Sequence, residues 1–223
     1  MGSVPPDAVA YKSPRETLAE MRLGNSRFWT GQSERPNMSM VERRELISGQ
    51  RPRVMVIGCA DSRVPIEIVF DLGIGDVFVC RNAGNLTNDS VAGSIDFAVH
   101  VLGIKLVVVM GHQGCFSVKA AMAKPFVAPK PPMLAKMLVD IRESLDYCVD
   151  VLDGIEDKTA HDREAVIANA QVQVRRIVEE PGIKLKVERK ELLVIASFYD
   201  MNSGIVDFVE PREPSLRSRK EKY

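Results

Sequence analysis

The chain has 223 residues, of which 45% are hydrophobic and 27% charged, so it can bury a substantial core. Its 30 basic and 30 acidic residues cancel, which argues against a net field that would attract nucleic acid or an anionic membrane. No apolar run reaches the roughly 18 residues of a membrane-spanning helix, and no signal-peptide pattern opens the chain. We therefore expect a cytoplasmic protein, unless an organelle transit peptide has been removed. We expect no membrane and no nucleic-acid partner.

The first elements expected along the chain are two helices. Ser13, Pro14 and Glu16 form a helix start, with an N-cap residue, a proline in the first turn and a capping-box glutamate. A second helix is expected over 39–47. The apolar residues that follow the first helix start are Leu18, Met21, Phe28 and Trp29. Because this apolar face needs a surface to lie against, we expect the N-terminal helices (14–48) to pack on a partner subunit.

Three short apolar runs alternate with helical patterns in the next stretch. The runs are VMVIG (54–58), DVFVC (76–80) and KLVVVMG (105–111), and helical patterns lie near 65–72 and 89–102. Short β-branched runs that alternate with helices predict a parallel sheet covered on both faces.

The second half of the chain is predicted to be mostly helical. Helices are expected from Cys115 to Ala123, over 133–152 and over 162–180, with Pro181-Gly182 ending the last of them. ELLVIASFYD (191–200) and GIVDFVE (204–210) then predict a pair of strands, followed by a loose basic tail, 211–223. The fold class predicted is α/β, one domain with a central, mostly parallel sheet flanked by helices.

Two groups of reactive side chains directly follow apolar strands. Cys59 ends the first run in VIGCADSR (56–63), and His112 and Cys115 follow VVVM in GHQGC (111–115). The carboxyl ends of parallel strands meet at one edge of a sheet, so these three side chains converge if the two strands are neighbours. One imidazole and two thiolates leave a fourth position open, as catalytic zinc sites do. The alternative for each cysteine is a small apolar core residue.

The remaining cysteines and histidines have simpler interpretations. Cys80 lies inside a strand pattern and Cys148 on an amphipathic helix, so both are expected to be packing residues. His100 and His161 are expected on helices as solvated or packed side chains. Four cysteines without a secretory signal predict reduced thiols.

Four motifs in order and spacing resemble those of the β-class carbonic anhydrases. They are CADSR (59–63), RNAGN (81–85), SIDFAVHVLG (94–103) and GHQGC (111–115), and the resemblance spans most of residues 14–123. It implies one zinc ion per chain, held by Cys59, His112 and Cys115. It also implies that Asp61, paired with Arg63, assists a zinc-bound hydroxide in the reversible hydration of carbon dioxide to bicarbonate and a proton, so the chain would be a carbonate dehydratase. In some members of the family this aspartate instead occupies the fourth zinc position in an inactive state, and the sequence leaves that alternative open.

The same resemblance implies a substrate pocket and an assembly. Gln50, Phe78, Ala83 and Phe97 would line the carbon dioxide pocket, and Arg81 and Asn82 would support the site. The protein would be a homodimer or a larger homo-oligomer with the site at the subunit interface. Its segments would be the N-terminal helices (14–48), the zinc-site core (50–123), a helical segment (124–182), the C-terminal strands (190–210) and the tail (211–223).

One departure from the family pattern keeps other functions open. Phe116 follows the second cysteine, where the family usually has glycine, and its ring would either narrow the pocket or turn into the core. A changed pocket allows a hydrolase of carbonyl sulfide or carbon disulfide on the same scaffold. A non-catalytic zinc protein that binds a partner through the basic tail is a further alternative, which the Asp61–Arg63 pair argues against. The basic residues of the tail are Arg212, Arg217, Arg219, Lys220 and Lys222.

Overall fold

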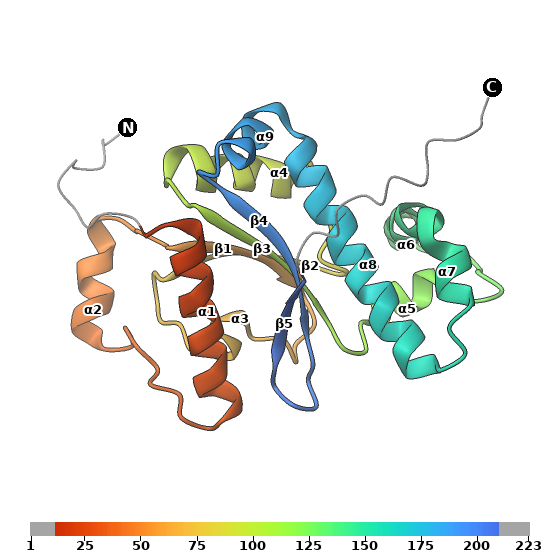
Figure 1. The fold of residues 1–223 in the computed structure, drawn as a ribbon, viewed down its shortest axis with the longest axis horizontal. Coiled ribbons are helices and arrows are strands. Elements are labelled where there is room, and N and C mark those ends of the chain that lie inside the picture. Colours follow the sequence, from red (N-terminus) through yellow and green to blue (C-terminus); the bar gives the residue numbers. More distant parts are fainter. Residues whose placement is uncertain (1–11, 210–223) are drawn as a thin grey trace.

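A five-stranded sheet organises the computed structural model, which describes residues 12–209 (Figure 1). The strands lie side by side in the order β2-β1-β3-β4-β5. The first four are parallel, and β5 joins β4 as an antiparallel edge. The predicted fold class is confirmed; the expected tail, 211–223, lies outside the described residues. The strands are β1 (Val54–Cys59), β2 (Val77–Asn82), β3 (Leu106–His112), β4 (Leu193–Tyr199) and β5 (Val206–Val209).

Helices cover both faces of the sheet, and α8 packs directly on β3 and β4 (Figure 1). The helices, including the short 3-10 segments η1 and η3 and the π-helical segment η2, are α1 (Pro14–Trp29), α2 (Met40–Glu45), η1 (Leu46–Ser48), α3 (Ile66–Val69), α4 (Asp89–Asp96), η2 (Phe97–Val101), α5 (Phe116–Ala121), α6 (Pro132–Leu145), η3 (Asp146–Cys148), α7 (Val149–Asp153), α8 (Lys158–Glu179) and α9 (Pro181–Glu188).

The alternation of side chains along the strands divides the core between the two faces. Met55 and Ile57 of β1 pack with α8 residues such as Ala170 and Ile177. Val54 and Val56 point to the other face. Because every residue of β1 and β3 is buried, these two central strands form a rigid base whose carboxyl ends carry the candidate site.

The helices differ from the expected ones in detail. α8 ends at Glu179, so the chain stops this helix before Pro181-Gly182 as expected, but Pro181 also begins a further helix, α9, which was not expected, because proline suits the first turn of a helix. α8 begins at Lys158, since the Asp157 side chain caps it by accepting from the Ala160 N–H at 2.6 Å. The helix expected over 133–152 is interrupted at 146–148 by a 3-10 turn.

The N-terminal helices differ in what they bury. Leu18 and Met21 of α1 are buried in the core of their own chain, whereas Trp29 is 47% exposed, so this apolar face is covered only in part. α2 buries no residue at all, and its Met40 and Val41 are 54% and 62% exposed. Packing of α2 on a partner subunit therefore stays a prediction, and the exposed apolar side chains of α2 are a surface that could make this contact.

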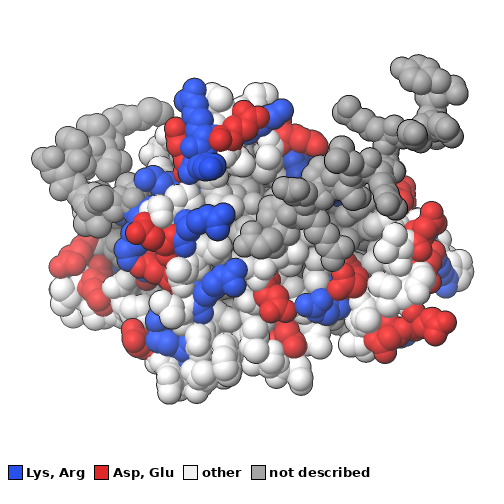
Figure 2. All heavy atoms as spheres, in the orientation of Figure 1, with Lys and Arg blue, Asp and Glu red and all other residues white. Residues whose placement is uncertain are grey.

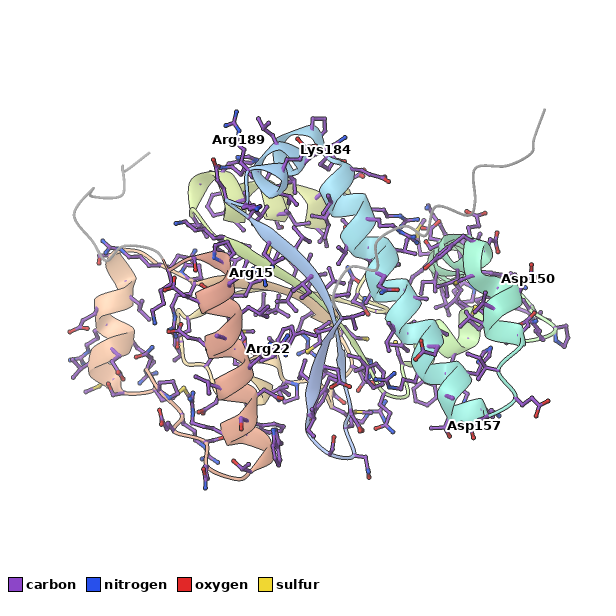
Figure 3. The ribbon with its side chains drawn as sticks, viewed as in Figure 1. Arg15, Arg22, Asp150, Asp157, Lys184 and Arg189 are labelled. Carbon is purple, nitrogen blue, oxygen red and sulfur yellow. The ribbon has the colours of Figure 1, made fainter. Side chains whose placement is uncertain are left out.

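Charged side chains lie on the outer surfaces of the helices. On the face shown in Figure 2, basic and acidic residues are interspersed. Figure 3 labels basic residues on α1 and around α9 and acidic residues around α7 and the start of α8: Arg15, Arg22, Lys184, Arg189, Asp150 and Asp157. Among the described residues, no helix has the length and apolarity that crossing a membrane requires.

Candidate functional site

Two neighbouring strands deliver the candidate metal ligands to one edge of the sheet. β1 ends at Cys59 and β3 ends at His112, and the two strands are paired in parallel up to Gly58 and Met110. Cys115 follows after a tight loop, directly before the first residue of α5. The ligand atoms of Cys59, His112 and Cys115 all lie within 4.8 Å of one another. One ion placed among them is in reach of all three.

The imidazole of His112 is oriented for metal binding. Its Nδ1 lies 2.9 Å from the carbonyl oxygen of Gln113, and since a carbonyl can only accept, Nδ1 carries the proton. Nε2 is therefore left with a lone pair. Although the side chain is 0% exposed, Nε2 has no hydrogen-bond partner among the described residues. A buried acceptor without a partner is costly in a native protein, and a metal ion would satisfy it.

The two thiols are also buried, and together they favour a cation. The Cys115 thiol hydrogen-bonds to the Cys59 sulfur and lowers the pKa of Cys59 to about 4, against the effect of burial. His112 and the backbone at Gly84 and Asp61 lower this pKa further. The pKa of Cys115 is raised, because it shares that proton with Cys59 and because it is buried. A divalent cation would stabilise both thiolates at once.

Asp61 stands beside this group but is held by Arg63. The Arg63 Nε and Nη2 donate to the two carboxylate oxygens at 2.9 and 2.7 Å, and the Arg63 backbone N–H donates at 3.0 Å. These bonds hold the pKa of Asp61 well below its usual range. Arg63 also donates to the carbonyl of Gly114 at 3.4 Å, which ties the pair to the loop between His112 and Cys115.

The last two residues of β2, Arg81 and Asn82, hold the backbone around the site with their side chains. Arg81 donates to the carbonyl oxygens of Cys59 at 2.9 Å and Asp61 at 2.6 Å. The Asn82 side chain donates to the Leu86 carbonyl and accepts from the Leu86 N–H, both at 2.7 Å, and so closes the loop that follows β2. That these two residues support the function of the site stays a prediction.

The expected substrate pocket is not assembled around the ligands within one chain. Phe78 is paired with Met55 near the start of β1, whereas Cys59 is paired with Asn82. Four residues of strand separate the two positions by about 13 Å. Phe78 and Phe97 lie near each other, with ring centroids 6.2 Å apart. Gln50 is exposed and precedes β1, also at the far end of the strand.

Two of the expected pocket residues do lie near the ligands. Ala83 directly follows Asn82, the pairing partner of Cys59. Phe116 follows Cys115, and its ring is 74% exposed, so it is not part of the core of this chain. The ring centroid lies 5.9 Å from Cζ of Arg63, within the range of a cation–π contact. Phe116 therefore stands at the rim of the site beside the Asp61–Arg63 pair.

Sequence reasoning missed two buried amides behind the site. Asn169 and Gln173 of α8 are 0% exposed and bond to the loop that follows β2. The signal was present, because a polar pair four residues apart inside an apolar helix face is unusual. The other cysteines and histidines lie outside the ligand group: Cys80, Cys148, His100 and His161.

Comparisons with known proteins point to one family. The family model described as carbonic anhydrase matches residues 54–206. Carbonic anhydrase 2 of Mycobacterium tuberculosis is 48% identical over 111 residues, which are 50% of this chain and 54% of that protein, so the match spans about half of each. Tetrameric β-carbonic anhydrases of Sordaria macrospora superpose with a TM-score of 0.70 at 25% identity, covering 86% of this chain and 96% of theirs. The β-carbonic anhydrase CafA of Aspergillus fumigatus gives a TM-score of 0.65 at 28% identity, over 90% and 93%.

Proposed function

This chain belongs to the β-class carbonic anhydrase family, and from that premise we propose that it catalyses the reversible hydration of carbon dioxide to bicarbonate and a proton. The observation that carries the proposal is the convergence of Cys59, His112 and Cys115 at one sheet edge, with the Asp61–Arg63 pair beside them. A buried set of two thiols and one imidazole fits zinc and leaves a fourth position open. We expect one zinc ion per chain.

Zinc held by Cys59, His112 and Cys115 would act as a Lewis acid that lowers the pKa of a water molecule, so that its deprotonated form is available to attack carbon dioxide near neutral pH. The protein contributes orientation. His112 keeps its Nε2 lone pair available because Nδ1 is engaged by the Gln113 carbonyl. The loop after β2 and the carbonyl bonds from Arg81 fix the backbone on both sides of Asp61 and Cys59.

Asp61 orients the attacking water rather than removing its proton. Its carboxylate is a weak base, because the bonds from Arg63 hold its pKa well below the usual range. An ionised carboxylate nevertheless accepts hydrogen bonds from water strongly. Arg63 also keeps Asp61 from turning to the metal, since both carboxylate oxygens are occupied by the guanidinium. A fourth position on a bound metal ion would then be open to water.

The active assembly contains at least two copies. Within one chain Gln50, Phe78 and Phe97 lie far from the ligands, so they line a carbon dioxide pocket only if a second subunit presents them. An exposed apolar surface is available for such packing. It includes Met38, Met40, Val41 and Ile47. A homodimer or a larger homo-oligomer with the site at the subunit interface is therefore part of the proposal.

Two assays on the same purified protein test the function. Stopped-flow hydration of carbon dioxide should show zinc-dependent turnover, and a sulfide-release assay with carbonyl sulfide or carbon disulfide should show little. The sulfur substrates are tested because Phe116 stands at the rim of the site, where its ring changes the approach to the ligands. Sulfide release without hydration would replace the proposed reaction by hydrolysis on the same scaffold. A zinc-loaded protein with neither activity would support the alternative of a non-catalytic zinc protein that binds a partner.

A further inference from the structure

Two buried amides on α8 face the loop that follows β2. Asn169 and Gln173 lie four residues apart, so they share one face of the helix. Both side chains are 0% exposed. Their neighbours along the helix are apolar, including Val166, Ala170 and Val172. Apolar residues of the same size would fill this space without the cost of burying an amide, which indicates that the amides have a specific task.

Each amide holds a backbone group of the loop. Asn169 Nδ2 donates to the carbonyl oxygen of Gly84 at 2.9 Å. Gln173 Oε1 accepts from the backbone N–H of Thr87 at 2.9 Å. The second amide atoms, Asn169 Oδ1 and Gln173 Nε2, have no hydrogen-bond partner among the described residues. The hydrogen bonds that these two buried amides make are therefore directed at the loop.

The loop in turn contacts the Cys59 sulfur. The backbone N–H of Gly84 helps to lower the pKa of the Cys59 thiol, and the Ala60 N–H donates to the Asn82 carbonyl oxygen at 3.0 Å, which holds the start of the loop against the strand end that carries Cys59. The same peptide segment is closely packed on another side, because a Cβ placed on Gly84 would lie only 2.8 Å from Cδ1 of Ile141 and 3.4 Å from Cβ of Ser117. Gly84 also has a φ of +79°, which only glycine adopts freely. The position of this N–H is thus set by α8 on one side and by α5 and α6 on another.

We propose that Asn169 is a positioning residue of the metal centre: by holding the Gly84 carbonyl oxygen it fixes the backbone at Gly84, so that the Gly84 N–H is directed at the sulfur of Cys59. Gln173 assists by holding Thr87, farther along the same loop. An N–H bond to a ligand sulfur withdraws charge from the thiolate and fixes its direction, so it tunes the metal as outer partners of ligands do. This inference rests on the proposed function, since it takes the three ligands to bind zinc.

Zinc affinity, measured by competition with a chromophoric chelator, tests the proposal on the full chain. Asn169→Leu keeps the size of the side chain but removes the donor to Gly84. We expect its zinc affinity to fall roughly 10- to 100-fold, the usual effect of losing an outer partner of a ligand. In the cobalt-substituted protein, the sulfur-to-cobalt charge-transfer band should shift, because the environment of one sulfur has changed.

Asn25→Leu is the matched control. Asn25 of α1 is also a buried amide, which donates to the carbonyls of Val69 and Gly204 and accepts from the Val206 N–H, on the other side of the sheet. Its loss should lower the melting temperature and leave the cobalt spectrum and zinc affinity unchanged. Gln173→Met is the second variant, in case Asn169→Leu does not fold, and should weaken zinc binding in the same direction but less.

The outcomes separate this inference from the function on which it rests. A wild-type protein that binds no zinc would end both. Wild-type zinc binding together with an unchanged affinity and spectrum in folded Asn169→Leu, or in Gln173→Met where only that variant folds, would overturn the positioning role alone. Equal losses of affinity in Asn169→Leu and Asn25→Leu would also overturn it, because the effect would then follow general stability.

Discussion

Asp61 Oδ2 lies 3.9 Å from His112 Nε2, yet both oxygens of the Asp61 carboxylate are hydrogen-bonded to Arg63. The carboxylate thus stands next to the ligand group without being free to join it. This relationship separates two roles that one acidic residue could have at a metal centre, ligand and water-orienting group. The structure shows the arrangement that suits the second role.

Asp61→Asn should abolish most activity while leaving the metal in place. The substitution preserves shape but removes the charge that accepts a hydrogen bond from water. We expect carbon dioxide hydration to fall by roughly 10²-fold or more, the scale for losing the correct placement of a reacting group. Zinc content, measured on the same sample, should stay near one per chain. Loss of zinc would make Asp61 structural, and normal turnover would make it a bystander.

Replacing any of the three ligands should lower zinc content. Cys59→Ser, Cys115→Ser and His112→Ala each remove one ligand from a set that has only three from the protein. Cys80→Ser is the matched control, because Cys80 packs against the core and lies outside the group. The zinc content of each variant, measured after gel filtration, should be low for the three ligand variants and unchanged for Cys80→Ser. Equal zinc loss in Cys80→Ser would contradict the assignment.

Phe116→Ala should cost little stability. Its ring is 74% exposed, whereas that of Phe70 is 0% exposed. Phe70→Ala should lower the free energy of unfolding by about 3–5 kcal/mol, and Phe116→Ala by well under half of that. Urea unfolding of both variants gives the comparison. A loss at Phe116 as large as at Phe70 would show that the assembly buries the ring.

Removing the Phe116 ring should also raise the rate of carbon dioxide hydration. The ring stands at the rim of the site beside Arg63, so Phe116→Gly opens the approach to the ligands. A lower rate with an unchanged melting temperature would instead show that the ring holds Arg63 on Asp61. Stopped-flow assays and thermal melts on one preparation decide between these results.

Asp71 should contribute stability that depends on pH. Burial alone would raise its pKa, but hydrogen bonds from Arg27 at 2.5 Å and from the N–H groups of Glu34 and Arg35 outweigh burial and lower it. A carboxyl whose pKa is lower in the folded state stabilises that state above the unfolded pKa, about 3.9. The contribution is lost as pH falls from there through the folded pKa.

The comparison of wild type with Asp71→Asn measures this contribution. Asparagine tolerates the φ of +49° at this position, so backbone strain is not added. The difference in unfolding free energy should be about 1–3 kcal/mol at neutral pH and should shrink below about pH 4. A difference that does not change with pH would show that the charge of Asp71 is not the stabilising feature.

The sheet was accessible from sequence because its strands are short, β-branched and buried on both faces. Helix boundaries were harder, as Pro181 illustrates: proline both follows helices and begins them, and only the chain geometry decides. Within the site, Cys59 and His112 could be placed because each lies at the carboxyl end of a strand. The position of Cys115 depends in addition on the loop after His112, which turns back toward the sheet edge that carries Cys59 and His112.

Other parts of the site depend on contacts that no local pattern encodes. The bond between Asn169 and Gly84 joins residues 85 positions apart. The opposite case is Phe78, which the family likeness assigns to the pocket although strand register puts it at the far end of the sheet. That assignment stays a prediction that only a second subunit can fulfil.

X-ray absorption at the zinc edge of the purified protein tests the central claim most directly. The account predicts one zinc ion per chain with two sulfur ligands, one imidazole nitrogen and one light fourth ligand, at about 2.3 Å for sulfur and 2.0–2.1 Å for nitrogen. A shell of four sulfurs, or a gently purified protein without zinc, would contradict it.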